Sequence, residues 1–139
     1  MKALGCILAG FLFVACAPTS AYVAARNIET GAAQFVDTAA DTWHAYSHAR
    51  LENIKDSCGD LDCFKTAAGQ WESGTVAPAD KAIAAARDAV KTFDAVMGAA
   101  DAAQTKDFSA AIQKLVEAVT SLVSILNGYG LTLSVFKVL

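Results

Sequence analysis

Two long stretches of the chain carry apolar residues at alternating spacings of three and four, the repeat that marks one face of an α-helix. The first stretch has Ile83, Ala86, Val90, Phe93, Met97 and Ala100 at these positions. The second has Phe108, Ile112, Leu115, Val119, Leu122 and Leu126. Only the short connection Gln104–Lys106 separates the two helices that these stripes predict. The pattern therefore predicts an antiparallel helical hairpin.

Residues that favour helix ends flank both stripes. Pro78 suits the first turn of a helix, where its missing amide hydrogen is harmless, and Glu72–Thr75 before it reads as a turn. Asp107 is a suitable N-cap for the second helix of the hairpin. Asn127–Gly128 predicts its end, with the chain in the left-handed conformation.

A third helix is predicted from Ser20 to about Ile54, a region that has no Pro and only one Gly. Its apolar stripe comprises Ile28, Ala32, Phe35, Ala39, Trp43, Tyr46 and Ile54. Phe64–Ala68 is a candidate short helix, with Trp71 packing back on the bundle. The chain has 30 Ala and 2 Pro among 139 residues, which favours closely packed helices over a β-sandwich or barrel. The expected fold is an all-α bundle of three helices.

The first residues match a secretory signal peptide, which we assign to residues 1–15. Lys2 precedes the apolar run Ala3–Ala17, and small residues follow. Because a finished transmembrane helix needs about 20 apolar residues, the run is marginal as a permanent anchor. An uncleaved anchor and a cut after Ala17 remain alternatives, although Pro18 would follow that cut and disfavour it.

The segment Phe13-Val14-Ala15-Cys16 resembles the lipobox of bacterial lipoprotein precursors. The resemblance implies that Cys16 is acylated, with chains such as palmitate, and becomes the first residue of a lipid-anchored domain spanning 16–139. Phe13 departs from the family pattern, in which Leu is usual. Ala17 after the Cys implies sorting to the outer membrane, with the domain facing the periplasm. The expected partner of Cys16 is the membrane itself.

Cys58 and Cys63 remain as a pair once Cys6 and Cys16 are assigned to the signal peptide and the anchor. An even pair in an exported protein predicts a disulfide. A zinc site is the alternative, but it needs two further ligands, and no His lies close in the sequence.

Asp41, His44 and His48 follow one another at helical spacing and can share one face of the first helix. Such a face could chelate zinc or copper, although an exposed polar face explains the same residues. The aromatic residues Trp43, Tyr46 and Trp71 suit either a binding patch or the core.

No motif of a catalytic, phosphate-binding or dinucleotide-binding site occurs in the chain. We therefore expect no enzyme, no cofactor and no small-molecule substrate. The acidic residues Asp56, Asp60 and Asp62 lack the spacing of a calcium-binding loop and fit turn chemistry instead. A formal net charge of −3 leaves no basic face for nucleic acid.

The resulting hypothesis is a cell-envelope lipoprotein that acts by contact, with another envelope protein as its partner. In length and layout the chain is similar to small helical lipoproteins of tailed phages and prophages. That similarity implies a role in the host envelope, such as lysis support or superinfection exclusion. Two alternatives remain: a periplasmic metal-binding protein using Asp41, His44 and His48, and a membrane-active protein acting through its apolar tail, Leu131–Leu139.

Overall fold

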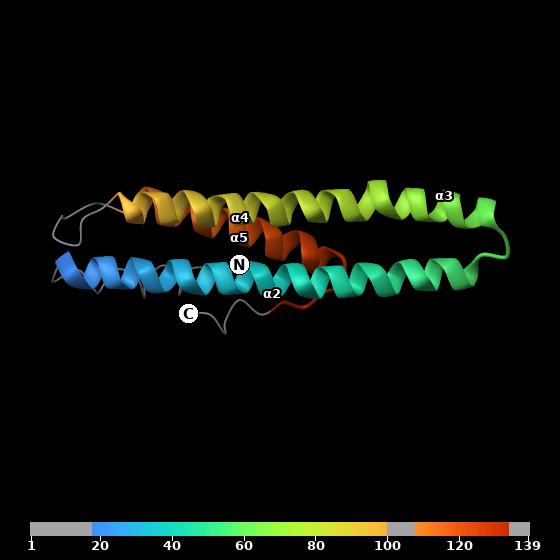
Figure 1. Cartoon of the computed structure of the whole chain (residues 1–139), viewed down its shortest axis with the longest axis horizontal. Coiled ribbons are helices and arrows are strands. Elements are labelled where there is room, and N and C mark those ends of the chain that lie inside the picture. The colour runs from blue at the N-terminus through green and yellow to red at the C-terminus, as the bar shows by residue number, and fades with distance from the viewer. Residues whose placement is uncertain (1–17, 100–107, 134–139) are drawn as a thin grey trace.

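One helix, α2 (Pro18–Ser57), runs the length of the molecule as an unbroken element of 40 residues (Figure 1). At 1.5 Å per residue it measures about 60 Å. The computed structural model describes residues 18–99 and 108–133, so the predicted signal peptide, Cys16 and Asp107 lie outside it. The helix is longer at both ends than the predicted Ser20–Ile54. Pro18 is tolerated because it lies in the first turn, and Lys55–Ser57 carry no helix breaker.

A second continuous rod returns antiparallel to α2. It is made of α3 (Leu61–Trp71), the π-helical segment η1 (Glu72–Val76) and α4 (Ala77–Gly98). The predicted turn at Glu72–Thr75 is therefore wrong, and Pro78 lies close to a junction inside the rod.

The π-helical geometry explains how Pro78 is accommodated. A proline lacks the amide hydrogen of a helix interior, and its ring pushes against the carbonyl four residues earlier. In η1 the helix widens, and the Ala77 N–H donates to the carbonyl of Glu72, five residues back. The wider turn relieves the clash without breaking the rod.

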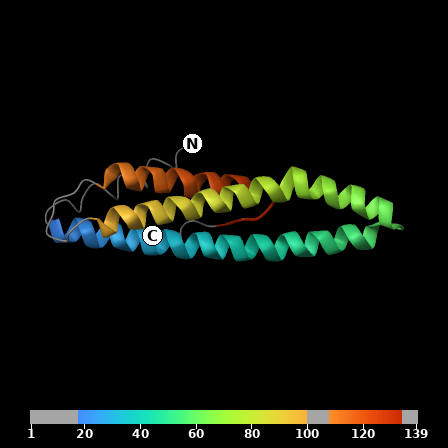
Figure 2. The ribbon, with the colours of Figure 1, turned by 45° about the horizontal axis from the view of Figure 1, so that its top comes forward.

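Helix α5 (Ser109–Gly128) lies antiparallel to α4 and covers only part of the long α2–α4 pair (Figure 2). Its predicted end at Gly128 is confirmed, but the left-handed residue is Gly130, with φ of 88°. Gly128 is still helical, and the chain reverses two residues later because the Leu131 N–H donates to the carbonyl of Leu126.

The core is apolar and is shared by α2, α4 and α5. Its fully buried large side chains are Trp43, Phe93, Met97, Leu115, Leu122, Leu126 and Val36. Small residues such as Ala39, Ala40 and Ala86 lie between them and let the helices approach closely. The predicted all-α bundle of three helices, the last two antiparallel, is confirmed for the part of the chain that the structure describes.

Beyond the end of α5, the two rods continue as a two-helix arm, residues 47–71 (Figure 2). No side chain in the arm is fully buried. The arm is therefore held together by side chains that are at most partly buried, unlike the core of the bundle. It forms the end of the molecule that α5 does not cover.

Candidate functional site

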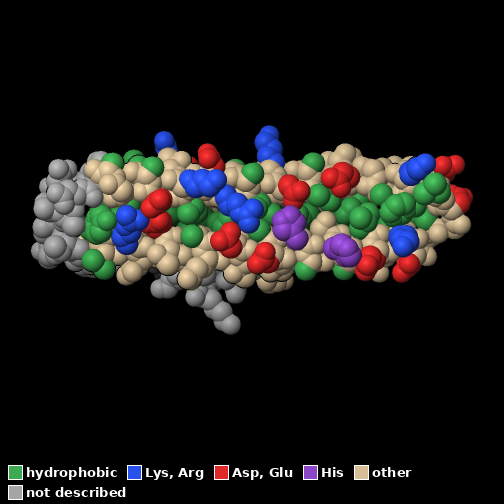
Figure 3. All heavy atoms as spheres, viewed as in Figure 1, with side chains coloured by type: hydrophobic (Ala, Val, Ile, Leu, Met, Phe, Trp, Pro, Cys, Tyr) green, Lys and Arg blue, Asp and Glu red, His purple; other side chains and the backbone are tan. Residues whose placement is uncertain are grey.

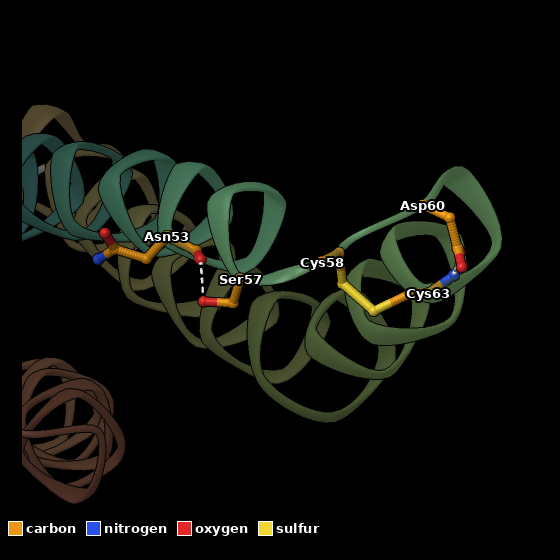
Figure 4. Close-up of a disulfide and its surroundings, with 5 residues drawn as sticks. All are labelled: Asn53, Ser57, Cys58, Asp60 and Cys63. Carbon is orange, nitrogen blue, oxygen red and sulfur yellow. Dashed lines mark hydrogen bonds between the residues drawn. A yellow bond between two sulfur atoms is a disulfide. The ribbon is translucent and has the colours of Figure 1, made fainter.

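A disulfide between Cys58 and Cys63 closes the tip of the arm (Figure 4). Their Cα atoms are 5.6 Å apart, and the two sulfur atoms lie at bonding distance, as the sequence predicted. Asp60 caps α3, because its Oδ1 accepts a hydrogen bond of 2.8 Å from the Cys63 N–H. The Ser57 hydroxyl donates to the carbonyl of Asn53 at 2.6 Å and closes the last turn of α2. The tip is thus fixed on both sides of the turn.

Four aromatic rings meet where α5 ends and the arm begins. Trp43 lies at the centre, with its ring centroid 5.9 Å from Tyr46, 6.3 Å from Trp71 and 5.6 Å from Tyr129. The Trp43 Nε1–H donates to Asp80 Oδ1 at 2.9 Å. Tyr129, just past α5, was not foreseen as a member of this cluster, because helix periodicity does not extend beyond the predicted end at Gly128.

These rings settle which of the predicted aromatic candidates face solvent. Trp43 is completely buried, so as a surface anchor it is excluded and belongs to the core. Tyr46 and Trp71 are half-buried and pack against that core from the side of the arm. The Nε1 atom of Trp71 is buried and has no hydrogen-bond partner among the described residues.

Asp41, His44 and His48 are all exposed on one face of α2, the face that shows the two histidines in Figure 3. His48 Nδ1 lies 3.8 Å from Glu52 Oε1, one turn further along the helix. Among residues 18–99 and 108–133, no three His, Cys, Asp or Glu side chains are arranged to hold a metal ion. The structure therefore places the three residues on one face but does not assemble them into a metal site.

His44 also borders a shallow groove between α2 and α4, of about 280 Å³. Asp80, Arg87 and Lys91 line it from α4. Arg87 donates to Asp37 Oδ1 at 3.3 Å across the groove. Charges of both signs line this groove, which is open to solvent.

At the end of the molecule opposite the arm, Arg26 links α2 to α4. Its guanidinium contacts the Tyr22 hydroxyl at 3.2 Å, Glu29 at 2.8 Å and Asp94 of α4 at 2.9 Å. The hydrogen bonds to Tyr22, Asp94 and Glu29 raise the pKa of Arg26 above its ordinary value. The side chain thus stays charged and links α2 to the end of α4.

The first residues after α5 pack on the surface of the bundle. Leu131 and Leu133 pack against the core, and the Leu133 N–H donates to Asn127 Oδ1 at 3.1 Å. The rest of the predicted apolar tail, 134–139, lies outside the described residues. Helix α5 is long and apolar enough to cross a membrane, yet in the bundle its Leu115, Leu122 and Leu126 are buried.

Four large apolar side chains stand out on the surface: Val23, Leu51, Leu61 and Val116. Two of them belong to the arm, where Leu51 is 37% and Leu61 is 63% exposed. Figure 3 shows apolar side chains in line between α2 and α3 along this end of the molecule. On the face that Figure 3 shows, apolar side chains of the arm are therefore open to solvent.

Comparisons with protein-family models, curated proteins and solved structures found no match to this chain.

Proposed function

We propose that the chain is an exported protein, lipid-anchored at Cys16, whose helical bundle works by contact with another envelope protein. The observation that carries the proposal is the disulfide between Cys58 and Cys63. Its position at the tip leaves it open to reductants, because Cys63 is exposed and Cys58 half-buried. Such a bond persists in an oxidising compartment and is rare in the cytosol. Export is the property that the lipobox-like segment implies independently.

The start of α2 lies close in the sequence to the proposed anchor. The helix begins at Pro18, so only Ala17 would separate it from an acylated Cys16. One acyl chain binds a membrane marginally, whereas two or three hold it firmly. We expect the start of α2 to lie at the lipid surface and the arm to extend away from it.

The described bundle supports a function by contact with a partner. Its core holds no buried polar or charged side chain, and its grooves are shallow. Together with the similarity in layout to small helical phage lipoproteins, this supports a role in the host envelope, either lysis support or superinfection exclusion. The bundle would act there as a rigid surface for a partner.

Intact mass spectrometry of the product made in a diderm bacterium tests the anchor. We expect a mass that starts at Cys16 and includes added acyl chains. In detergent phase partitioning, the Cys16→Ser variant should move to the aqueous phase or remain as unprocessed precursor. Cys6→Ser is the matched control, since it makes the same change inside the signal segment and should leave acylation unaltered. A mature mass without acyl groups would contradict the proposal.

A further inference from the structure

The disulfide at the tip of the arm is open to solvent. Cys63 is exposed and Cys58 is half-buried, and Gly59 and Asp60 between them are both exposed. A side chain added at Gly59 would meet no atom within 4 Å, so the turn has free space around it. Figure 4 shows that the bond joins the end of α2 to the first turn of α3. Exposed disulfides are the labile ones, because exchange requires a thiolate to reach one of the two sulfur atoms.

Helix α3 depends on this bond because its other contacts are weak. None of its residues is fully buried. At its far end the half-buried ring of Trp71 packs against α2, with its centroid 6.3 Å from that of Trp43 and 6.2 Å from that of Tyr46. At the tip, the bond between Cys58 and Cys63 ties α3 to the end of α2 covalently. Without the bond, only partly buried side chains would hold the helix, so we expect α3 to loosen.

The loosening should stop where the buried core begins. No side chain in the range 44–78 is buried, whereas α2 before this range, α4 and α5 all contribute buried residues. The π-helical segment η1 lies at this boundary, between α3 and α4. Irregular turns of this kind are places where a helix bends. Loss of the bond should therefore change the arm and leave the three-helix core folded.

We propose that the Cys58–Cys63 pair is a thiol-exchange site through which a protein dithiol sets the state of the arm, closed when oxidised and loosened when reduced. A thiolate of the dithiol attacks Sγ of Cys63, the more exposed residue. The sulfur–sulfur bond breaks, and Cys58 Sγ leaves as a thiolate that takes up a proton. The second thiol of the dithiol then attacks the mixed disulfide and releases Cys63. Two electrons and two protons pass to the pair, and the dithiol becomes a disulfide.

The reduced pair is placed to close again. Only four residues separate Cys58 from Cys63, so the two thiols stay close together. Two hydrogen bonds at the turn involve no sulfur atom: the Cys63 N–H donates to Asp60, and the Ser57 hydroxyl donates to the carbonyl of Asn53. An oxidised dithiol can therefore restore the bond by the reverse steps. This exchange goes beyond the proposed contact function and requires neither the lipid anchor nor a docked partner.

The rate of reduction tests whether the folded chain itself reacts. The full chain carries Cys6→Ser and Cys16→Ser, so that the pair holds its only cysteines, and is kept in detergent micelles. Dithiothreitol is the probe, and alkylation followed by mass spectrometry counts the free thiols. Ile83→Val is the matched variant, because Ile83 is buried in the core and its truncation raises the unfolded population about fivefold. We expect a rate that rises with dithiothreitol concentration and is unaltered by Ile83→Val.

Tryptophan fluorescence reports the response of the arm. The chain has two tryptophans, Trp43 in the core and Trp71 at the end of α3, and acrylamide quenches whichever of them it reaches. Reduction should raise quenching at least about twofold, because α3 loosens around Trp71. The Trp71→Phe variant should show no rise. Cys58→Ser with Cys63→Ser should give the reduced value with or without dithiothreitol, and oxidised glutathione should return the reduced parent to its starting value.

Three outcomes overturn the proposal. A reduction rate that rises about fivefold in Ile83→Val would mean that the bond reacts only in the unfolded chain. Unchanged quenching after complete reduction would mean that the bond does not set the state of the arm. Increased quenching in Trp71→Phe would mean that reduction opens the core around Trp43 as well. None of these measurements uses acylation at Cys16, so failure of the exchange site and failure of the anchor are distinguishable.

Discussion

Two tryptophans that touch each other have opposite hydrogen-bond states. The indole N–H of Trp43 is bonded to Asp80, whereas that of Trp71 is buried without a partner among the described residues. A buried donor that lacks an acceptor costs free energy, while a satisfied donor contributes about 1 kcal/mol. The same substitution at these two positions should therefore have different effects on stability.

We predict that Trp43→Phe lowers the free energy of unfolding by about 2 kcal/mol, from the lost hydrogen bond and the cavity left in the core. Trp71→Phe should cost less than about 1 kcal/mol, because it also removes the unpaired donor. Urea denaturation of the two variants measures the difference. A larger loss for Trp71→Phe than for Trp43→Phe would contradict this prediction.

The sequence could place Trp43 on the apolar stripe but could not decide between core and surface. That choice depends on the rings that neighbouring elements pack against Trp43, including Tyr129 just past the end of α5. The metal hypothesis met a similar limit. Helical spacing correctly put Asp41, His44 and His48 on one side of α2, but spacing on one helix says nothing of the further ligands that neighbouring elements must supply.

At the scale of the element, the π-helical segment η1 holds α3 and α4 in register. One wide turn accommodates about one residue more than a regular α-helical turn would. Without that extra residue, the apolar face of α3 would be turned by about 100° relative to that of α4. The segment thus lets both faces meet α2.

A deletion tests this account. In a Pro78→Ala background, removing Gly74 should give a regular helix with the apolar faces still aligned, and the free energy of unfolding should change by less than about 1 kcal/mol. Removing Ala85 in the same background shifts the stripe after Ile83 by 100° and should prevent cooperative folding. Circular dichroism on heating distinguishes the two. Equal damage from both deletions would refute the register role of η1.

The disulfide also stabilises the arm, where α3 has no fully buried residue to hold it in place. Closing so short a loop restricts the unfolded chain by about 2 kcal/mol in the loop-entropy estimate. We predict that Cys58→Ser with Cys63→Ser lowers the free energy of unfolding by about that amount. A reductant should destabilise the parent protein equally and leave the variant unchanged. Hydrogen exchange should rise more in the arm than in α5.

Helix periodicity predicted α5 and the long stripe of α4 because those segments are amphipathic over many turns. It failed at Glu72–Thr75, where Gly74 and the nearby Pro78 predict a turn from local chemistry alone. The packing of Trp71 and the residues around it against α2 outweighs that local preference. The two-helix arm was also not foreseen, because its length depends on that same unbroken rod.

At the scale of the whole molecule, the proposed anchor at Cys16 precedes the start of α2 in the sequence, and the tip of the arm follows its other end. We predict that, in vesicles carrying the acylated chain, a fluorophore at Asn53 is quenched less by acceptor lipids than one at Ala33. The two positions are 20 residues apart along one helix, about 30 Å. A version without acyl chains, mixed with the same vesicles, supplies the baseline. Equal quenching at both positions would mean that the bundle lies flat on the membrane.

The continuity of α2 has a mechanical consequence. If Cys16 is acylated as proposed, a partner bound at the tip would pull on a helix that is unbroken from Pro18 to Ser57. A displacement of one end of α2 would then move the other end as well, because a continuous helix stretches little along its axis. Under the proposed anchor, tension between the membrane and a partner bound at the tip would act along the whole of α2.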